Sequence, residues 1–297
     1  MRHLLEIDDL TSAELHAVLD RAEAPDADPV LGGKGMALLF EKPSARTRNS
    51  MELAIVALGG HPVTIRGEEV GFDVRETTED ITRTLACYHA AIGARVFEHS
   101  QVERMAAVGA VPIVNLLSDQ AHPMQALADL LTIRQVLGRL DVTVTYVGDA
   151  NNVARSLALA VALSGGRFRI AAPQGHRFDP ATLDRIAAAG TTVEEHDRPE
   201  PAIDGADVVY TDVWTSMGQE AESAARLRAF EGFTITDTML TSMADGGIFL
   251  HCLPAHRGEE AEAEVVDGSR SHIWHQAANR MHAARGLLWW LMEQTAT

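Results

Sequence analysis

The sequence predicts an α/β protein with two domains, each a mostly parallel sheet flanked by helices. Short apolar runs of strand length alternate with amphipathic segments of helix length along the chain. This alternation falls into two successive cycles, and 297 residues suffice for two ordinary cores. We expect a first domain over residues 1–137, a second over residues 138–275, and a final helix over residues 276–297.

Residues that start and stop helices divide these cycles into elements. Thr11-x-x-Glu14 and Ser100-x-x-Glu103 have the form of capping boxes, and Gly109 closes the second of the two helices. Short apolar runs that lack such helix-capping residues indicate buried strands of a parallel sheet. The pattern predicts strands at 36–40, 63–65, 90–97, 111–116, 142–147, 168–171, 208–210 and 247–250, with helices between most of them.

The turn after the first strand concentrates groups that bind phosphate. It holds Ser44, Arg46, Thr47 and Arg48, and a helical pattern whose apolar positions include Leu53 follows it. A helix N-terminus offers unpaired N–H groups, hydroxyls add neutral donors, and guanidinium groups add cationic ones. The segment is therefore a candidate phosphate cradle, although taken alone a capped helix with solvated arginines is the better interpretation, and the rest of the chain has to decide.

Further polar residues stand where other strands end. Arg95 interrupts an apolar run near its end, and Asp212 follows a later strand. His122 and Gln125 flank Pro123 in the first turn of a long helix. Ligands of open α/β sheets bind at the carboxyl ends of the strands, so these residues are candidates for a site, with an edge arginine and a capping histidine as the alternatives.

The net charge of the chain limits the kinds of molecule that it can bind. A formal net charge of -17 disfavours nucleic acid or an anionic membrane as the main partner, because both need a basic surface. An arginine pocket in such a protein would serve a small anion. Acidic residues come too early for a signal peptide, and no apolar run approaches the roughly 20 residues that span a bilayer. We expect a cytoplasmic protein.

Neither a metal nor a dinucleotide is expected. Cys87 and Cys252 are the only cysteines, and they lack zinc-ligand spacing, so both should be reduced thiols. The turn at Gly148–Ala154 follows a strand as in nicotinamide-dependent oxidoreductases, but it lacks the G-x-G-x-x-G spacing. That class is therefore disfavoured.

Four segments together resemble the aspartate/ornithine transcarbamoylase family. They are Ser-Ala-Arg-Thr-Arg at 44–48, His-Pro-Met-Gln at 122–125, Asp-Val-Trp-Thr-Ser-Met-Gly at 212–218 and His-Cys-Leu-Pro at 251–254. They occur in the family's order, and the resemblance covers essentially the whole chain. The last two segments are similar to those of members that use ornithine rather than aspartate.

The resemblance implies a carbamoyl-phosphate-binding first domain, an ornithine-binding second domain, a last helix that returns to the first domain, and a homotrimer or an assembly of trimers. It implies no cofactor and no metal. The catalytic residues would be Arg95, His122, Asp212 and Cys252. Carbamoyl phosphate would be bound by Ser44, Ala45, Arg46, Thr47, Arg95, His122, Gln125, Cys252, Leu253 and Arg280, and ornithine by Asn152, Asp212, Ser216 and Met217.

The implied reaction converts carbamoyl phosphate and L-ornithine into L-citrulline and phosphate, a step of arginine biosynthesis. An alkyl amine has a pKa near ~10.4, so the site must select or create the free amine. Asp212 and Cys252 are expected to hold that amine, without a covalent cysteine intermediate, because carbamoyl phosphate is already activated.

Two residues depart from the family pattern. Ala45 stands where the family usually has threonine, and Glu69 aligns where the family commonly has glutamine. The first loses a hydroxyl, and the second would place a carboxylate close to phosphate. The alternatives are a transcarbamoylase for another amine, such as putrescine or an acylated ornithine, and a non-catalytic homologue that binds carbamoyl phosphate.

Overall fold

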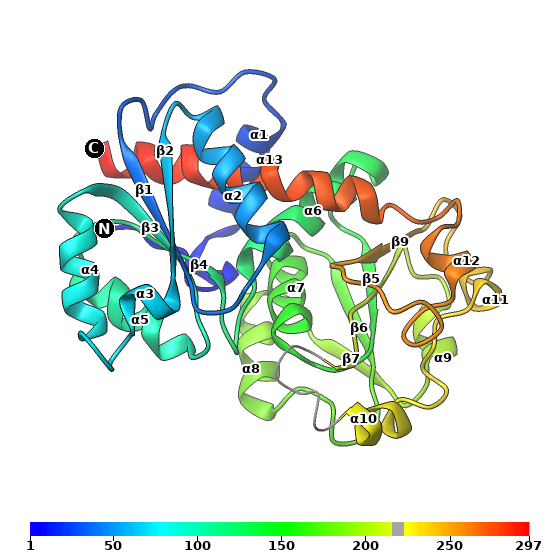
Figure 1. Cartoon of the computed structure of the whole chain (residues 1–297). Helices are drawn as coiled ribbons and strands as arrows, with labels where there is room; N and C mark the ends of the chain where they lie inside the picture. The colour runs from blue at the N-terminus through cyan, green and yellow to red at the C-terminus, as the bar shows by residue number, and fades with distance from the viewer. Residues whose placement is uncertain (216–222, 297) are drawn as a thin grey trace. The chain divides into compact units, whose positions relative to one another are not determined.

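The computed structural model describes residues 1–215 and 223–296. The chain forms two compact α/β units (Figure 1). Unit 1 comprises Met1–Ala128 and Ala278–Thr297, and unit 2 comprises Asp129–Ala277. Within the described ranges, no helix is both long enough and apolar enough to cross a membrane.

Unit 1 is built on a four-stranded sheet in which every pairing is parallel. The strand order is β2 (His61–Arg66), β1 (Gly35–Phe40), β3 (His89–Arg95) and β4 (Ile113–Leu117). The helices are α1 (Ser12–Glu23), α2 (Ala45–Ala57), α3 (Gly67–Val70), α4 (Thr78–Ala86), α5 (His99–Val108), the start of α6 (Pro123–Leu137) and most of α13 (Ile273–Ala296), with a short 3-10 helix η1 (Ile7–Asp9) near the N-terminus.

One core of unit 1 lies between its sheet and the pair α4 and α5. Ala37 and Leu39 of β1 face this layer, and their register partners Ile92 and Ala94 of β3 face it too. Side chains alternate along a strand, so the other residues of β1 are buried on the opposite face. The continuous apolar run of the first strand follows from this burial on both faces, as predicted.

The capping box predicted at Thr11 is present, whereas the one predicted at Ser100 is not. Thr11 and Glu14 form the capping box of α1, with Thr11 N donating to Glu14 Oε2 at 2.8 Å. The box expected at Ser100 is wrong. Helix α5 begins at His99 instead, and the backbone N–H of His99 donates to the distant carboxylate of Asp119 at 2.8 Å. A tertiary partner thus replaces the local cap.

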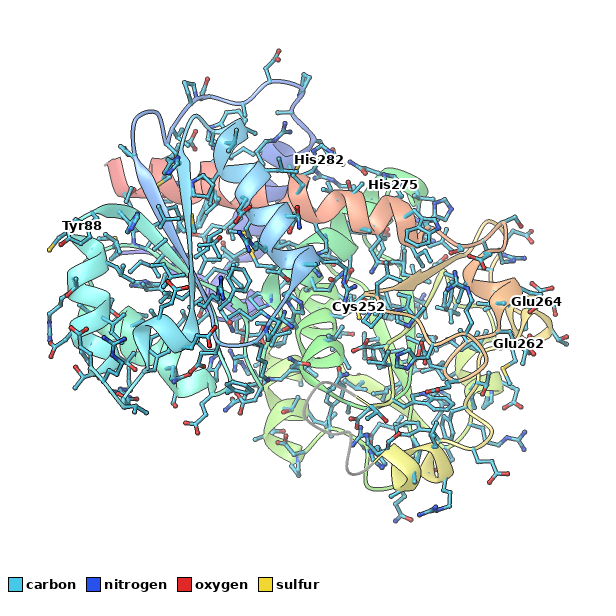
Figure 2. All side chains as sticks on the ribbon, in the orientation of Figure 1. Tyr88, Cys252, Glu262, Glu264, His275 and His282 are labelled. Carbon is cyan, nitrogen blue, oxygen red and sulfur yellow. The ribbon has the colours of Figure 1, made fainter. Side chains whose placement is uncertain are left out.

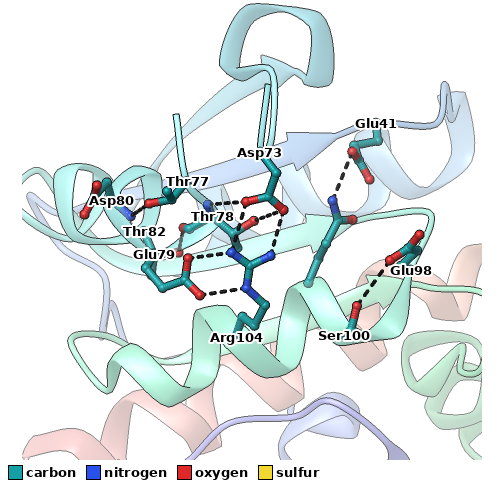
Figure 3. Close-up of polar contacts among 11 residues, drawn as sticks. Glu41, Asp73, Thr77, Thr78, Glu79, Asp80, Thr82, Glu98, Ser100 and Arg104 are labelled. Atoms are coloured by element: carbon teal, nitrogen blue, oxygen red, sulfur yellow. Dashed lines mark hydrogen bonds and ion pairs between the residues drawn. The ribbon is translucent and has the colours of Figure 1, made fainter. Parts of the chain in front are cut away.

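The polar segment between β2 and α4 is anchored by a single arginine (Figure 3). Arg104 of α5 donates to Asp73 Oδ2 at 2.7 Å and to Glu79 Oε1 at 2.6 Å. The Arg104 hydrogen bonds lower the pKa of both carboxyl groups. The segment is therefore tied to α5 rather than being only a solvated connection.

Unit 2 contains a five-stranded parallel sheet. The order is β7 (Val193–His196), β6 (Arg167–Ala171), β5 (Thr143–Val147), β8 (Val208–Thr211) and β9 (Ile248–His251). Beyond α6 and the first turn of α13, its helices are α7 (Asn152–Leu163), α8 (Pro180–Ala189), α9 (Pro199–Ile203), α10 (Ser223–Ala229), α11 (Asp237–Leu240) and α12 (Ala263–Val266). The sequence analysis missed β7, whose Val-Glu-Glu-His sequence is polar because it forms an edge.

The last helix returns to unit 1, as expected from the resemblance. Gly286 of α13 lies directly against α1. A Cβ atom added there would stand 2.5 Å from Val18 O and 2.6 Å from Ala22 N. The chain passes between the units inside α6 and again inside α13, so the division at 137/138 and 275/276 stays a prediction.

We predict that Gly286→Ala destabilises unit 1 by about 1–3 kcal/mol, because the added methyl group must push two helix backbones apart. Urea unfolding of the variant and the wild type measures this difference. Gln294→Ala, at an exposed position of the same helix, is the control and should change the free energy of unfolding little. Equal stability of Gly286→Ala and wild type would contradict the close contact.

Candidate functional site

The turn from β1 into α2 forms the base of an anion site in unit 1. Ser44 is the N-cap of α2, and its hydroxyl accepts from Thr47 N at 3.3 Å. Helix α2 begins at Ala45, so Arg46 and Thr47 lie in its first turn rather than in the connection before it, where the sequence pattern placed them. The backbone N–H groups of that turn and the positive end of the helix dipole are available to an anion.

Arg280 connects this helix start to α6. Its Nη2 donates to Thr47 Oγ1 at 2.7 Å, and its Nη1 donates to Gln125 Oε1. All three side chains are buried. The structure therefore brings Arg280 of the last helix together with Thr47 and Gln125, which the sequence analysis expected at one site.

Positive charge accumulates around these residues. Burial, followed by the nearby charges of Arg280 and Arg46, lowers the pKa of Arg95 to about 10. The pKa of the buried His122 falls well below its ordinary value, first through burial and then through Arg280, Arg95 and Arg46. His122 is therefore a neutral imidazole at neutral pH.

Arg46 and Arg95 form no ion pair with a carboxylate in the part of the chain that the structure describes. Among the residues that the structure describes, no Asp or Glu oxygen lies within 4.0 Å of the Arg46 or Arg95 guanidinium. The buried Nε of Arg95 has no hydrogen-bond acceptor there either. Bringing like charges together at a buried position is unfavourable unless an anion joins them. The arrangement is that of an anion-binding site.

Arg48 and Lys42, two cations near the anion site, differ in their surroundings. Arg48 points elsewhere and pairs with Glu52 at 2.8 Å, so it is a surface residue of α2. Lys42, which the sequence analysis did not single out, has a pKa lowered by burial and then by Arg95. Its Nζ stands 4.6 Å from the centroid of the Phe97 ring. Its place just before Pro43 and Ser44 was the signal that could have identified it.

The two departures from the family pattern do not place a free carboxylate in the site. Ala45 is the first residue of α2, so its backbone N–H belongs to the first turn of the helix whatever its side chain. Glu69 is exposed, and its Oε1 lies 3.6 Å from Nε of Arg66 and 3.3 Å from the Arg66 backbone nitrogen. An exposed pair of this kind is weak, but it leaves the Glu69 charge next to a cation.

Unit 2 gathers a second polar cluster at the ends of three neighbouring strands. Asp212 follows β8 and Cys252 follows β9, and the thiol donates to Asp212 Oδ1 at 2.8 Å. Asn151, after β5, donates from Nδ2 to Asp212 Oδ2 at 3.0 Å. Backbone Val213 N also donates to Asp212 Oδ1 at 2.8 Å. Asp212 and Cys252 are both buried, so the carboxylate is held in a fixed orientation.

Asn152 was predicted to bind ornithine, and this assignment stays a prediction. The side chain that donates to Asp212 is that of the preceding residue, Asn151. Asn151 is also the N-cap of α7, accepting from Val153 N and Ala154 N. Asn152 is the first residue of that helix. Ser216 and Met217 lie outside the described residues.

The segment after β9 is fixed by a buried histidine. His251 Nε2 lies 3.0 Å from Glu260 Oε1, and His251 Nδ1 accepts from Leu253 N at 2.9 Å. The second contact leaves the ring proton on Nε2, facing the carboxylate. Leu253 has a left-handed φ of 61°, which turns the chain directly after Cys252.

Two groups have the donor types and spacing of a metal site. The ligand atoms of Asp212, His251 and Cys252 lie within 4.8 Å of one another, as do those of His256, Glu259 and Glu260. In the first group both imidazole nitrogens of His251 and the Cys252 thiol already form hydrogen bonds. A metal ion there would have to replace these bonds.

Comparisons with known proteins assign both halves of the chain. Residues 2–135 match the family description "aspartate/ornithine carbamoyltransferase, carbamoyl-P binding domain". Residues 140–291 match the description "aspartate/ornithine carbamoyltransferase, Asp/Orn binding domain". The chain belongs to the aspartate/ornithine carbamoyltransferase family.

Individual members of this carbamoyltransferase family are similar to this chain in sequence and structure along nearly its whole length. The ornithine carbamoyltransferase of Acidothermus cellulolyticus is 50% identical over 99% of this chain and 97% of its own. Solved structures of ornithine carbamoyltransferases from Thermus thermophilus and Pyrococcus furiosus are similar to this chain, with TM-scores of 0.90 and 0.93. The first is 43% identical and covers 98% and 99% of the two chains, and the second is 40% identical and covers 98% and 97%.

The lowered pKa of His122 predicts a pH dependence of stability. In the unfolded chain His122 binds a proton at about pH 6.5, whereas in the folded protein it binds one only at a lower pH. The free energy of unfolding therefore falls as the pH drops below about 6.5. We predict that His122→Gln loses less stability than wild type between about pH 6.5 and 5. Urea unfolding at a series of pH values measures the difference, and parallel curves would contradict the buried neutral imidazole.

Proposed function

We propose that this carbamoyltransferase transfers the carbamoyl group of carbamoyl phosphate to the side-chain amine of L-ornithine, giving L-citrulline and phosphate. The observation that carries the proposal is the convergence of Arg46, Arg95 and Arg280 on the N-terminus of α2. The family membership and the ornithine carbamoyltransferases among the relatives support the same substrates.

The anion site suits the donor substrate. A phosphate group would receive the backbone N–H groups of the first turn of α2, the Thr47 hydroxyl and the guanidinium groups of Arg46 and Arg280. As the amine attacks, negative charge grows on the carbonyl oxygen and then on the departing phosphate. Arg95 and neutral His122 would serve the first charge, the latter as a hydrogen-bond donor. Donors fixed before the reaction stabilise such charge without reorganisation.

The unit 2 cluster suits the acceptor substrate. The Asp212 carboxylate accepts two hydrogen bonds at Oδ1 and one at Oδ2 in the structure, and an alkylammonium group could donate to Oδ2 beside Asn151 while the Cys252 thiol keeps the carboxylate oriented. The amine must lose a proton before it attacks, because only the neutral form has a lone pair. A carboxylate and a soft thiol at a buried position would orient the amine, and no covalent cysteine intermediate is needed.

A transcarbamoylase for another amine remains the second candidate. Ser216 and Met217, which the resemblance assigns to the amino-acid end of ornithine, lie outside the described residues. Comparing L-ornithine with putrescine and N-acetylornithine as acceptors separates the two candidates, since putrescine lacks the amino-acid end and the acetylated compound blocks it.

We also propose that the protein acts in arginine biosynthesis in the cytoplasm as a homotrimer or an assembly of trimers, with the carbamoyl-phosphate domain over residues 1–137 and the ornithine domain over residues 138–275. The resemblance is the support for the assembly. Unit 1 also exposes several large apolar side chains, and Figure 2 shows Tyr88 projecting from its surface. These side chains are Leu53, Val56, Val74, Tyr88 and Phe97. Leu53 belongs to the apolar pattern that predicted its helix, and its exposure fits a surface that another chain covers.

We predict that Arg46→Ala lowers the rate of citrulline formation by on the order of 10² to 10³, because it removes a donor to the developing phosphate charge. Arg48→Ala is the matched control, two residues away on the same helix and paired with Glu52. A colorimetric citrulline assay of the purified variants measures both. Near-normal turnover by Arg46→Ala, or equal losses in both variants, would refute the assigned cradle.

For the acceptor side, we predict that Cys252→Ala raises the KM for ornithine and leaves binding of carbamoyl phosphate nearly unchanged, because Asp212 loses one of its donors. Cys252→Ser keeps a donor at the same position and should retain more of the wild-type kcat/KM. Steady-state kinetics with each substrate varied in turn tests this. An effect confined to carbamoyl phosphate would contradict the assignment.

A further inference from the structure

A buried arginine of α10 joins the two backbone segments that carry Asp212 and Asn151. Arg226 donates from Nε to the carbonyl oxygen of Trp214, two residues beyond Asp212. Its Nη2 forms an ion pair with Asp149, two residues before Asn151. The Arg226 side chain is only 9% exposed and that of Asp149 is 19% exposed.

The same two segments are joined again at their polar tips and at their strands. The tips meet in the 3.0 Å hydrogen bond from Asn151 Nδ2 to Asp212 Oδ2. Thr211 Oγ1, at the end of β8, donates to Val147 O of β5 at 2.6 Å. The Arg226 bridge lies beyond these two contacts along the chain. It thus limits how far the segments can separate after they leave the sheet.

Aromatic residues belong to the same group of contacts as the bridge. Trp214 and Phe230 stack with their ring centroids 5.3 Å apart, and the His176 ring lies 4.8 Å from Phe230. His176 Nδ1 also contacts the second oxygen of Asp149 at 3.1 Å. In this poorly solvated place an ion pair is stronger than in water, and each unmet partner is costly. The planar guanidinium supplies two donors at fixed angles, which a lysine cannot do.

We propose that Arg226 is a positioning residue for the amine end of ornithine. By holding Trp214 and Asp149 together, it sets the distance between the Asp212 carboxylate and the Asn151 amide. Neither Arg226 nor Asp149 contacts the substrate in this account. The inference rests on the proposed function, because it assigns Asp212 to the acceptor amine.

The central test compares Arg226→Gln with Arg228→Gln. Arg228 lies two residues further along the same helix and is exposed, so its substitution leaves the bridge intact. We expect Arg226→Gln to lower kcat/KM for ornithine by on the order of 10²-fold through a higher ornithine KM, since a small misplacement of a reacting group has this effect. Carbamoyl phosphate should bind with an unchanged Kd by calorimetry. Arg228→Gln should match wild type in both measurements.

Two further variants separate positioning from a general loss of stability. Arg226→Lys keeps the charge but cannot make both contacts, so it should fall between wild type and Arg226→Gln in ornithine KM. Asp149→Asn removes the other partner. If both act through one bridge, the double variant Asp149→Asn/Arg226→Gln should be little worse than the worse single variant.

The outcomes distinguish this inference from the proposed function. An active wild type whose Arg226→Gln variant keeps the wild-type ornithine KM would overturn the inference alone, as would a loss of kcat with both substrate affinities unchanged. A wild type that forms no citrulline would overturn both. If Arg226→Gln does not fold, Arg226→Lys and Asp149→Asn decide the question, and failure of all three to fold would show that Arg226 serves folding only.

Discussion

The accumulation of positive charge at the start of α2 is the constraint on which the anion site depends. Burial first, and then the nearby charges of Arg280 and Arg46, lower the pKa of Arg95 to about 10. The neutral side chains of Thr47 and Gln125 accept hydrogen bonds from the Arg280 guanidinium and orient it. Within the described residues 1–215 and 223–296, no Asp or Glu oxygen lies within 4.0 Å of the Arg46 or Arg95 guanidinium. Ion pairs with Asp or Glu would have stabilised the free protein but would have weakened its attraction for an anion.

The fold supplies these groups from segments far apart in the sequence. The parallel order of unit 1 places the ends of β1 and β3 side by side, which brings Arg46 close to Arg95. The last helix contributes Arg280 because Gly286 allows α13 to pack directly on α1. In unit 2 the neighbouring strands β5, β8 and β9 bring Asn151, Asp212 and Cys252 together by the same principle.

Local patterns were enough to predict most of the fold and to single out several residues that the structure brings together. The apolar run before Ser44 and the proline at the start of α6 mark elements whose ends hold site residues, because strand ends and helix starts leave characteristic residues in the sequence. Non-local contacts could not be predicted. The hydrogen bond from Asn151 to Asp212 joins residues 61 positions apart, and α5 begins at His99, whose backbone N–H donates to Asp119, 20 positions away. The resemblance was required to connect Arg280 with Thr47.

The central claim is that the arginine cluster binds the phosphorylated donor before the amine arrives. Isothermal titration calorimetry of the folded wild-type protein with carbamoyl phosphate, in the absence of ornithine and at two salt concentrations, tests it most directly. The account predicts saturable binding that weakens as salt rises, because the attraction is between charges. Absence of binding, or an affinity that requires ornithine to be present first, would contradict it.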